Sequence, residues 1–182
     1  MRFKAQQTIS LREPCFVWRA STGPLGSVTV IDALEAGQPR LEIRLFGIAR
    51  LQKISGGAMA AKGEIMRYLA EVAWAPDAIL LNRSLTWETA GGGSFRVGAG
   101  MGGVRGSVVL TLDERGRIGS VFAPDRPRYE GGDFVERPWQ GRFSDYREHQ
   151  GRWLPFEGEV GWVLDETSFV AWKGRLQSWS VS

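Results

Sequence analysis

The spacing of apolar residues changes period twice along this chain of 182 residues, and that change limits the folds the chain can form. Residues 2–12 alternate in polarity at every second position, as a strand with one buried face does. Residues 58–74 follow the helical spacing of three and four instead, and Pro76 ends this helix near Trp74. The apolar positions of the helix are Ile65, Met66, Leu69, Val72 and Ala73. After Pro76 the strand spacing returns.

Short runs of strand character, divided by Gly, Pro and Asp turns such as residues 123–127, fill the rest of the chain. These runs are residues 15–21, 27–37, 40–54, 85–90, 94–100, 104–113, 117–124, 141–151, 157–165, 167–172 and 174–181. Such spacing is typical of an antiparallel meander, and a sheet of roughly ten strands does not stay flat. We therefore expect an α+β, mostly β single domain over residues 1–182, built as one strongly curved sheet. This half-open barrel would have one long helix, inserted after about the fourth strand, covering or plugging its concave face.

Charge and composition disfavour several classes of function. The 23 Lys and Arg residues are scattered among 20 Asp and Glu, so nucleic-acid binding is not favoured. One cysteine, Cys15, and one histidine, His149, allow neither an intramolecular disulfide nor a typical zinc site, and we expect no metal and no cofactor. The chain has no apolar run of signal-peptide or membrane-spanning length. We expect a soluble, cytoplasmic protein without a transmembrane segment; peripheral membrane contact and the oligomeric state stay open.

The predicted helix carries a second, polar face formed by Glu64, Arg67, Tyr68 and Glu71. On a surface helix these residues would meet water and form weak ion pairs. On a helix that plugs a curved sheet they would line a hollow instead. Arg67 would then bind a carboxylate or phosphate, Tyr68 would donate a hydrogen bond and Glu71 would orient the guanidinium. Trp74 would form an apolar wall at the helix end.

Residues 126–149 concentrate arginine and aromatic residues, and they supply further candidates for the site. We expect Tyr129, Trp139 and Tyr146 to line it, with Tyr146 offering its hydroxyl. His149 is a candidate acid or base because its unperturbed pKa lies near neutrality. A lone histidine without a visible partner is also typical of an exposed turn.

Tryptophan is unusually frequent, with 8 residues, which exceeds what a core of this size needs. Core packing accounts for some of them, and we expect Trp87 and Trp162, both in predicted strands, to wall an apolar pocket. The glycine-rich residues 91–106 lie between strands, which favours a wide hairpin over a phosphate-binding loop.

The stretch "RYLAEVAWAP", residues 67–76, resembles the Arg-Tyr-Leu-x-Glu-x-x-Trp-x-Pro signature of an uncharacterised bacterial domain-of-unknown-function family. Later stretches, "LTWE", "PWQGRFSDYREHQGRWLP" and "EGEVGW", resemble further blocks of that family in the same order, so the resemblance covers about residues 1–180. It implies no particular activity. Many members carry an N-terminal membrane-anchoring segment, which we expect this chain to lack. More distantly, a meander with one covering helix is similar to the lipoprotein-carrier fold, which implies an apolar ligand.

Three hypotheses follow. The first is a binding module for a small apolar or amphipathic molecule, either lipid-like or an aromatic acid. The alternative is an enzyme, a lyase, isomerase or hydrolase of a hydrophobic substrate, using Glu71, Tyr146 or His149 with Arg67. The third is a partner-binding protein that uses a sheet edge or the glycine-rich hairpin. The pairing of Glu71 discriminates between the first two, because a carboxylate fully paired to Arg67 is a poor base.

Overall fold

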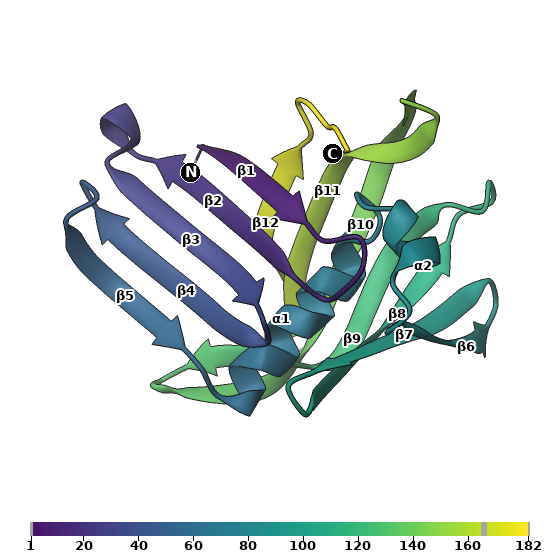
Figure 1. Ribbon diagram of the computed structural model, residues 1–182, viewed down its shortest axis with the longest axis horizontal. Helices are drawn as coiled ribbons and strands as arrows, with labels where there is room; N and C mark the ends of the chain where they lie inside the picture. Colours follow the sequence, from purple (N-terminus) through teal and green to yellow (C-terminus); the bar gives the residue numbers. More distant parts are fainter. Residues whose placement is uncertain (1, 165–166, 182) are drawn as a thin grey trace.

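The computed structural model describes residues 2–164 and 167–181, without the side chains of residues 52–54 and 167, and arranges them in two antiparallel sheets (Figure 1). Sheet 1 contains, in chain order, β1 (Phe3–Ile9), β2 (Phe16–Thr22), β3 (Val28–Glu35), β4 (Gln38–Leu45) and β5 (Ala49–Ser55). Sheet 2 contains β6 (Thr86–Gly91), β7 (Ser94–Met101), β8 (Val104–Leu112), β9 (Ile118–Glu130), β10 (Asp133–His149), β11 (Arg152–Leu164) and β12 (Thr167–Arg175). Each sheet is a meander in which every strand pairs with its neighbours in the chain.

The mostly β, antiparallel architecture confirms the prediction, but the expectation of one strongly curved sheet is wrong. The described strands form a sheet of five and a sheet of seven, and neither is closed. The reason is the long connection between β5 and β6, which holds α1 (Ala58–Glu71) and α2 (Asp77–Leu81). Because α1 contacts strands of both sheets, the two meanders pack on one helix instead of pairing with each other.

The helical segment is shorter than predicted. The α-helix ends at Glu71. The next residues form turns whose backbone hydrogen bonds span three residues, from Trp74 N–H to the Glu71 carbonyl oxygen (2.9 Å) and from Ala75 N–H to the Val72 carbonyl oxygen (3.1 Å). Pro76 has no N–H to donate but suits the start of a helix, and α2 begins directly after it. This second, five-residue helix was not predicted.

Two strand boundaries in sheet 2 also differ from the prediction. The expected turn at residues 123–127 is absent, because β9 continues to Glu130. The register of β9 with β10 shifts between Arg137 and Trp139, and Pro138 occupies this bulge, where the ladder requires no donor. At the end of the chain, β12 stops at Arg175, and residues 176–181 form no strand. Asp165, the predicted end of an earlier strand, lies outside the described residues.

The main core lies between α1 and sheet 2. Ile65, Met66 and Leu69 are completely buried there. A Cβ on Gly106 of β8 would lie 2.9 Å from Met66 Cγ and 3.2 Å from the Lys62 carbonyl oxygen. The absence of a side chain at Gly106 therefore allows the helix backbone to approach the sheet closely.

Sheet 1 covers another side of α1 with one of its two faces. Phe16 and Leu34 face each other across β2 and β3 and are buried in the same core. Because side chains alternate along a strand, Gln7 and Asp32 lie on this inner face as well, while Lys4 and Arg19 lie on the outer face. In the part of the chain that the structure describes, no helix is long and apolar enough to cross a bilayer.

Candidate functional site

Charged side chains from α1 and from both sheets meet in the interior, in what we call the central charge cluster. Its members are Asp32 of β3, Glu64, Arg67 and Glu71 of α1, and Arg126 of β9. Burial penalises an isolated charge. Each of these three acids and two arginines must therefore either pair with an opposite charge or have its pKa shifted towards the neutral form.

Arg67 is the paired arginine of the cluster. Its Nε lies 2.8 Å from Glu71 Oε1, its Nη1 bonds Asp32 Oδ2, and its guanidinium lies 4.7 Å from the centre of the Phe16 ring. Burial opposes the charge, but the Glu71 and Asp32 carboxylates outweigh burial and raise the pKa of Arg67 above its ordinary value. The other oxygen of Glu71 accepts a bond from Gln7 Nε2. Both oxygens of Glu71 are thus occupied, which weakens the case for Glu71 as a general base.

Glu64 is the unpaired acid of the cluster. Its Oε2 is buried without a hydrogen-bond partner in the described structure, and so is Asp32 Oδ1. Burial, together with the nearby charge of Asp32, raises the pKa of Glu64 to about 8. Glu64 is therefore mainly protonated at neutral pH, and its carboxyl group can donate a hydrogen bond there.

Arg126 is the unpaired arginine of the cluster. Its Nε donates to the Gly63 carbonyl (3.3 Å), next to Glu64 in the chain, and burial lowers its pKa. Its guanidinium lies 4.7 Å from the ring centre of Trp139 and 5.4 Å from that of Trp162, two residues that face each other across β10 and β11. Within residues 2–164 and 167–181, Arg126 forms no ion pair, and its terminal nitrogens have no protein partner.

The structure separates Tyr68 from Arg67, although the helical wheel placed them on one face. Tyr68 is completely buried; its hydroxyl donates to the Ser10 carbonyl (3.0 Å) and accepts from Asn82 Nδ2 (2.9 Å). Burial raises the pKa of this phenol. The side chain therefore ties α1 to the segments that precede β2 and β6.

Trp74, which the sequence placed at the end of the helix, lies three residues beyond the end of α1 and contacts sheet 2. Its Nε1 donates to the Pro155 carbonyl (2.8 Å), and its ring lies edge-on to Phe143 and Trp172. A Cβ on Gly158 would come within 2.6 Å of its ring, so the indole lies directly on the β11 backbone.

The three catalytic candidates bind different partners and form no common group. Glu71 belongs to the central charge cluster. The Tyr146 hydroxyl donates to the Ile118 carbonyl (2.7 Å) in sheet 2, and burial raises the pKa of Tyr146. His149 Nε2 bonds the Trp179 carbonyl oxygen (3.0 Å) near the end of the chain.

The remaining ligand candidates divide into two pairs. Trp139 and Trp162 are 2% and 8% exposed and lie beside Arg126. Trp87 and Tyr129 are 39% and 45% exposed, and Trp87 lies on β6, one of the two edge strands of sheet 2. The first pair therefore contacts the central charge cluster through Arg126.

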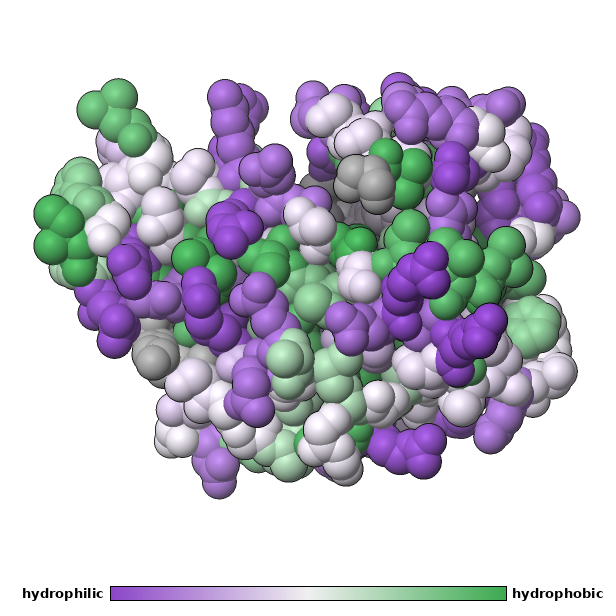
Figure 2. Space-filling model, in the orientation of Figure 1, coloured by the Kyte–Doolittle hydropathy of each residue, from purple (hydrophilic) through white to green (hydrophobic). Residues whose placement is uncertain are grey.

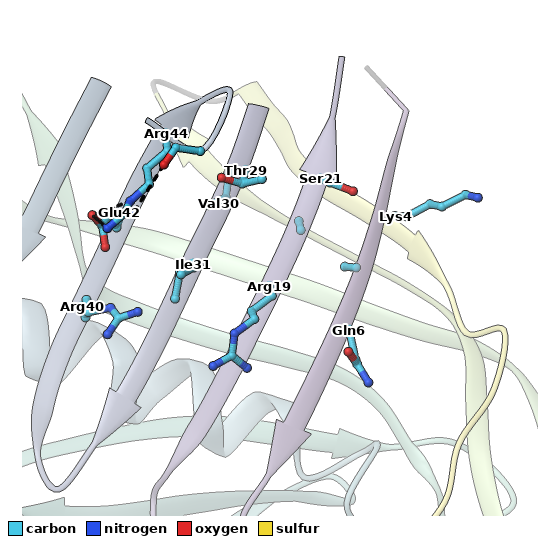
Figure 3. Close-up of a pocket in the computed structure, with 13 residues that line it drawn as sticks. Lys4, Gln6, Arg19, Ser21, Thr29, Val30, Ile31, Arg40, Glu42 and Arg44 are labelled. Atoms are coloured by element: carbon cyan, nitrogen blue, oxygen red, sulfur yellow. Dashed lines mark hydrogen bonds and ion pairs between the residues drawn. The ribbon is translucent and has the colours of Figure 1, made fainter. Parts of the chain in front are cut away.

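A groove of about 690 Å³ lies elsewhere, on sheet 1. Its lining includes Lys4 of β1, Arg19 of β2, and Arg40 and Arg44 of β4 (Figure 3). None of the predicted site residues lines this groove. We refer to it as the outer groove, because its charged side chains lie on the face of sheet 1 that alternation turns away from α1.

Sequence reasoning did not select Glu64 or Arg126 as site residues. Glu64 was visible on the polar helix face, but its lack of a partner depends on tertiary contacts. Arg126 fell in an expected turn. The bulge that keeps it on a strand beside Trp139 is marked in the sequence only by Pro124 and Pro138.

The fold and the central charge cluster define a class of protein: an antiparallel β protein of two sheets that pack on one connecting helix with charged residues in its interface. The chain belongs to the family of unknown function DUF6544, whose profile matches residues 1–174. This confirms the expected membership of a domain-of-unknown-function family. No curated protein and no solved structure matches the chain. Among the residues described, no three His, Cys, Asp or Glu side chains are placed to hold a metal ion.

Proposed function

We propose that the protein binds a small amphipathic molecule with an acidic end, and that Arg126 receives this end. The observation that carries the proposal is the state of Arg126: a guanidinium held against two tryptophans, with no carboxylate bound to it in the described structure. A partly buried arginine without a directly paired carboxylate gains most from an anionic ligand, since guanidinium and carboxylate pair through two parallel hydrogen bonds.

The surroundings of Arg126 suit both ends of such a ligand. Trp139 and Trp162 present ring surface to the apolar part. Glu64, with its pKa raised to about 8, is protonated at neutral pH and adds a hydrogen-bond donor without repelling the ligand. A lipid-like acid and an aromatic acid both meet these requirements.

This proposal keeps the ligand class expected from the sequence and changes the residue that binds it. Arg67 already neutralises Asp32 and Glu71, so it has less to offer an anion than Arg126. Trp74, Tyr146, Tyr68, Trp87 and Tyr129 stay candidates from sequence alone. The similarity to lipoprotein carriers also stays an expectation, and it agrees with an acyl-chain ligand. We place binding before catalysis because Glu71, Tyr146 and His149 are apart and each is hydrogen-bonded elsewhere.

The test is thermal unfolding of the purified protein with a medium-chain fatty acid, with an aromatic acid, and with the alcohol of equal length. We expect one of the acids to raise the melting temperature and the alcohol to have little effect, because only the acid pairs with Arg126. Arg126→Gln should abolish the shift. The control, Arg142→Gln, alters an exposed arginine of β10 and should leave it unchanged.

Native mass spectrometry of the freshly purified chain provides a second measurement, because a bound acid adds mass that Arg126→Gln should remove. If the alcohol raised the melting temperature as much as the acid, or if the acid raised that of Arg126→Gln as much as that of the wild type, the anion site would be elsewhere or would not exist.

A further inference from the structure

The two turns at one end of sheet 1 carry large apolar side chains that are mostly exposed to solvent. Leu25, in the β2–β3 turn, is 107% exposed, and Phe46 and Ile48, in the β4–β5 turn, are 71% and 89% exposed. The two turns are adjacent, since Phe46 N–H donates to the Ser27 carbonyl oxygen (2.6 Å). Figure 2 shows hydrophobic side chains projecting at this corner of the molecule. We refer to Leu25, Phe46 and Ile48 together as the apolar tip.

The fold does not explain the residues of the apolar tip. Leu25 and Phe46 have φ angles of 54° and 50°, in the left-handed region that favours Gly or Asn over a residue with a bulky side chain. Their exposure means that burial does not offset this backbone strain. Asn at either position would form the same turn at lower cost, so the apolar side chains indicate a contact outside the chain.

The surface beside the apolar tip is basic. The outer groove reaches the β4–β5 turn at Gly47, and its lining includes Lys4, Arg19, Arg40 and Arg44 but only one acid, Glu42. Glu42 is already bonded by Arg44 (2.9 Å) and by Arg50 (3.0 Å). Lys4 and Arg19 form no ion pair with any described residue, and residues 23–29 and 43–51 contain no acid at all. Positive charge at this end of sheet 1 is therefore not neutralised within the described chain.

We propose that this end of sheet 1 docks on an anionic lipid bilayer. The apolar tip would enter the interfacial region, and Lys4 and Arg19 of the outer groove would face the lipid phosphates. Separate apolar side chains on projecting turns, bordered by Lys and Arg, suit a soft, negatively charged surface. A protein interface more often presents a continuous apolar patch. This inference does not depend on the proposed ligand at Arg126.

The test is co-sedimentation with vesicles of phosphatidylcholine, alone or with about 30% phosphatidylglycerol, at low and at high salt. We expect binding to the anionic vesicles to be at least about tenfold stronger, and to weaken with salt as surface charges are screened. Leu25→Asn combined with Phe46→Asn and Ile48→Ser should reduce it by at least about tenfold. Lys4→Gln combined with Arg19→Gln should weaken it and reduce the dependence on salt.

The matched control is Leu80→Ser, which removes another strongly exposed leucine (85%) from α2 and should not alter binding. Circular dichroism and the melting temperature establish that each variant folds, and the Asn variants should melt no earlier than the wild type. Equal binding by the wild type and the apolar tip variant, or no binding to anionic vesicles, would overturn the proposal. Light scattering that shows a dimer lost in the apolar tip variant would overturn it too, because it would assign the tip to contact with a second copy.

Discussion

The two sheets contact the same helix in different ways. Sheet 2 meets α1 mainly through close apolar packing, in which Gly106 lies against Met66. Its two ion pairs with α1, from Lys62 to Asp125 and Glu136, involve acids that are exposed to solvent. Sheet 1 adds Phe16 and Leu34 but also places Asp32 and Gln7 against Arg67 and Glu71. Apolar burial stabilises in proportion to area, whereas an ion pair in the interior gains little over its desolvation cost. We infer that the sheet 2 contact mainly stabilises the fold, and that the sheet 1 contact mainly holds charged groups in place.

The largest expected effect concerns the apolar contact. Gly106→Val should lower the free energy of unfolding by about 3 kcal/mol, because the added side chain overlaps Met66 and the Lys62 carbonyl. The carbonyl belongs to the helix backbone and cannot move aside as a side chain can. Denaturant unfolding measures the loss. The control is Gly119→Val in β9, where a Cβ would meet its nearest neighbour at 3.6 Å, so its cost should stay below about 1 kcal/mol. Equal losses in the two variants would contradict close packing of α1 on β8.

The next effect concerns the ionic contact. Arg67→Leu should cost about 2 kcal/mol at pH 7, since it leaves Asp32 and Glu71 without their partner. If the cost comes from the unpaired acids, Arg67→Leu combined with Asp32→Asn and Glu71→Gln should recover more than half of it. Failure to recover would show that the arginine side chain stabilises by packing on Phe16 instead.

A smaller effect depends on pH. The carboxyl group of Glu64 has a pKa of about 8 in the folded protein and about 4.3 when unfolded, so the folded state binds the proton more tightly. The stability from protonation is complete below about pH 4.3 and is lost as the pH rises towards 8, because stability falls wherever the folded state holds more protons. Glu64→Gln cannot ionise and should be at least about 1 kcal/mol more stable than the wild type at pH 9, with little difference at pH 4.

Thermal unfolding of both proteins across this pH range measures the difference. For an acidic ligand at Arg126, affinity should also fall from pH 7 to pH 9 in the wild type and stay level in Glu64→Gln. Parallel stability curves for the two proteins would mean that Glu64 is ionised at neutral pH in the folded state.

The smallest effect is expected far from both contacts. Trp87→Ala should change the free energy of unfolding by less than about 1 kcal/mol, since the indole is 39% exposed on an edge strand. Ligand-induced shifts in melting temperature should also be unchanged, because Trp87 is not among the residues that contact Arg126. A loss of ligand binding in this variant would restore Trp87 to the site that the sequence predicted.

Local patterns predicted what depends on neighbours in the chain. The spacing of Arg67 and Glu71 by four residues predicted their contact, and the structure has it at 2.8 Å. The same spacing rule misplaced Tyr68, because a helical wheel does not show which element packs against each side. Neither Asp32 nor Arg126 could be joined to Arg67 from sequence, since they lie on strands of different sheets.

The sequence by itself determined the succession of short strands around one helical segment, because periods of two and of about 3.6 residues follow from backbone geometry alone. It also determined the family. The tertiary structure decided that the strands form two sheets instead of one, because α1 offers each meander a side on which to bury apolar surface. It likewise decided which charges are paired. Arg67 pairs with two carboxylates, whereas Arg126 packs against two tryptophans. This difference between the two arginines arises mostly from contacts between residues far apart in the chain.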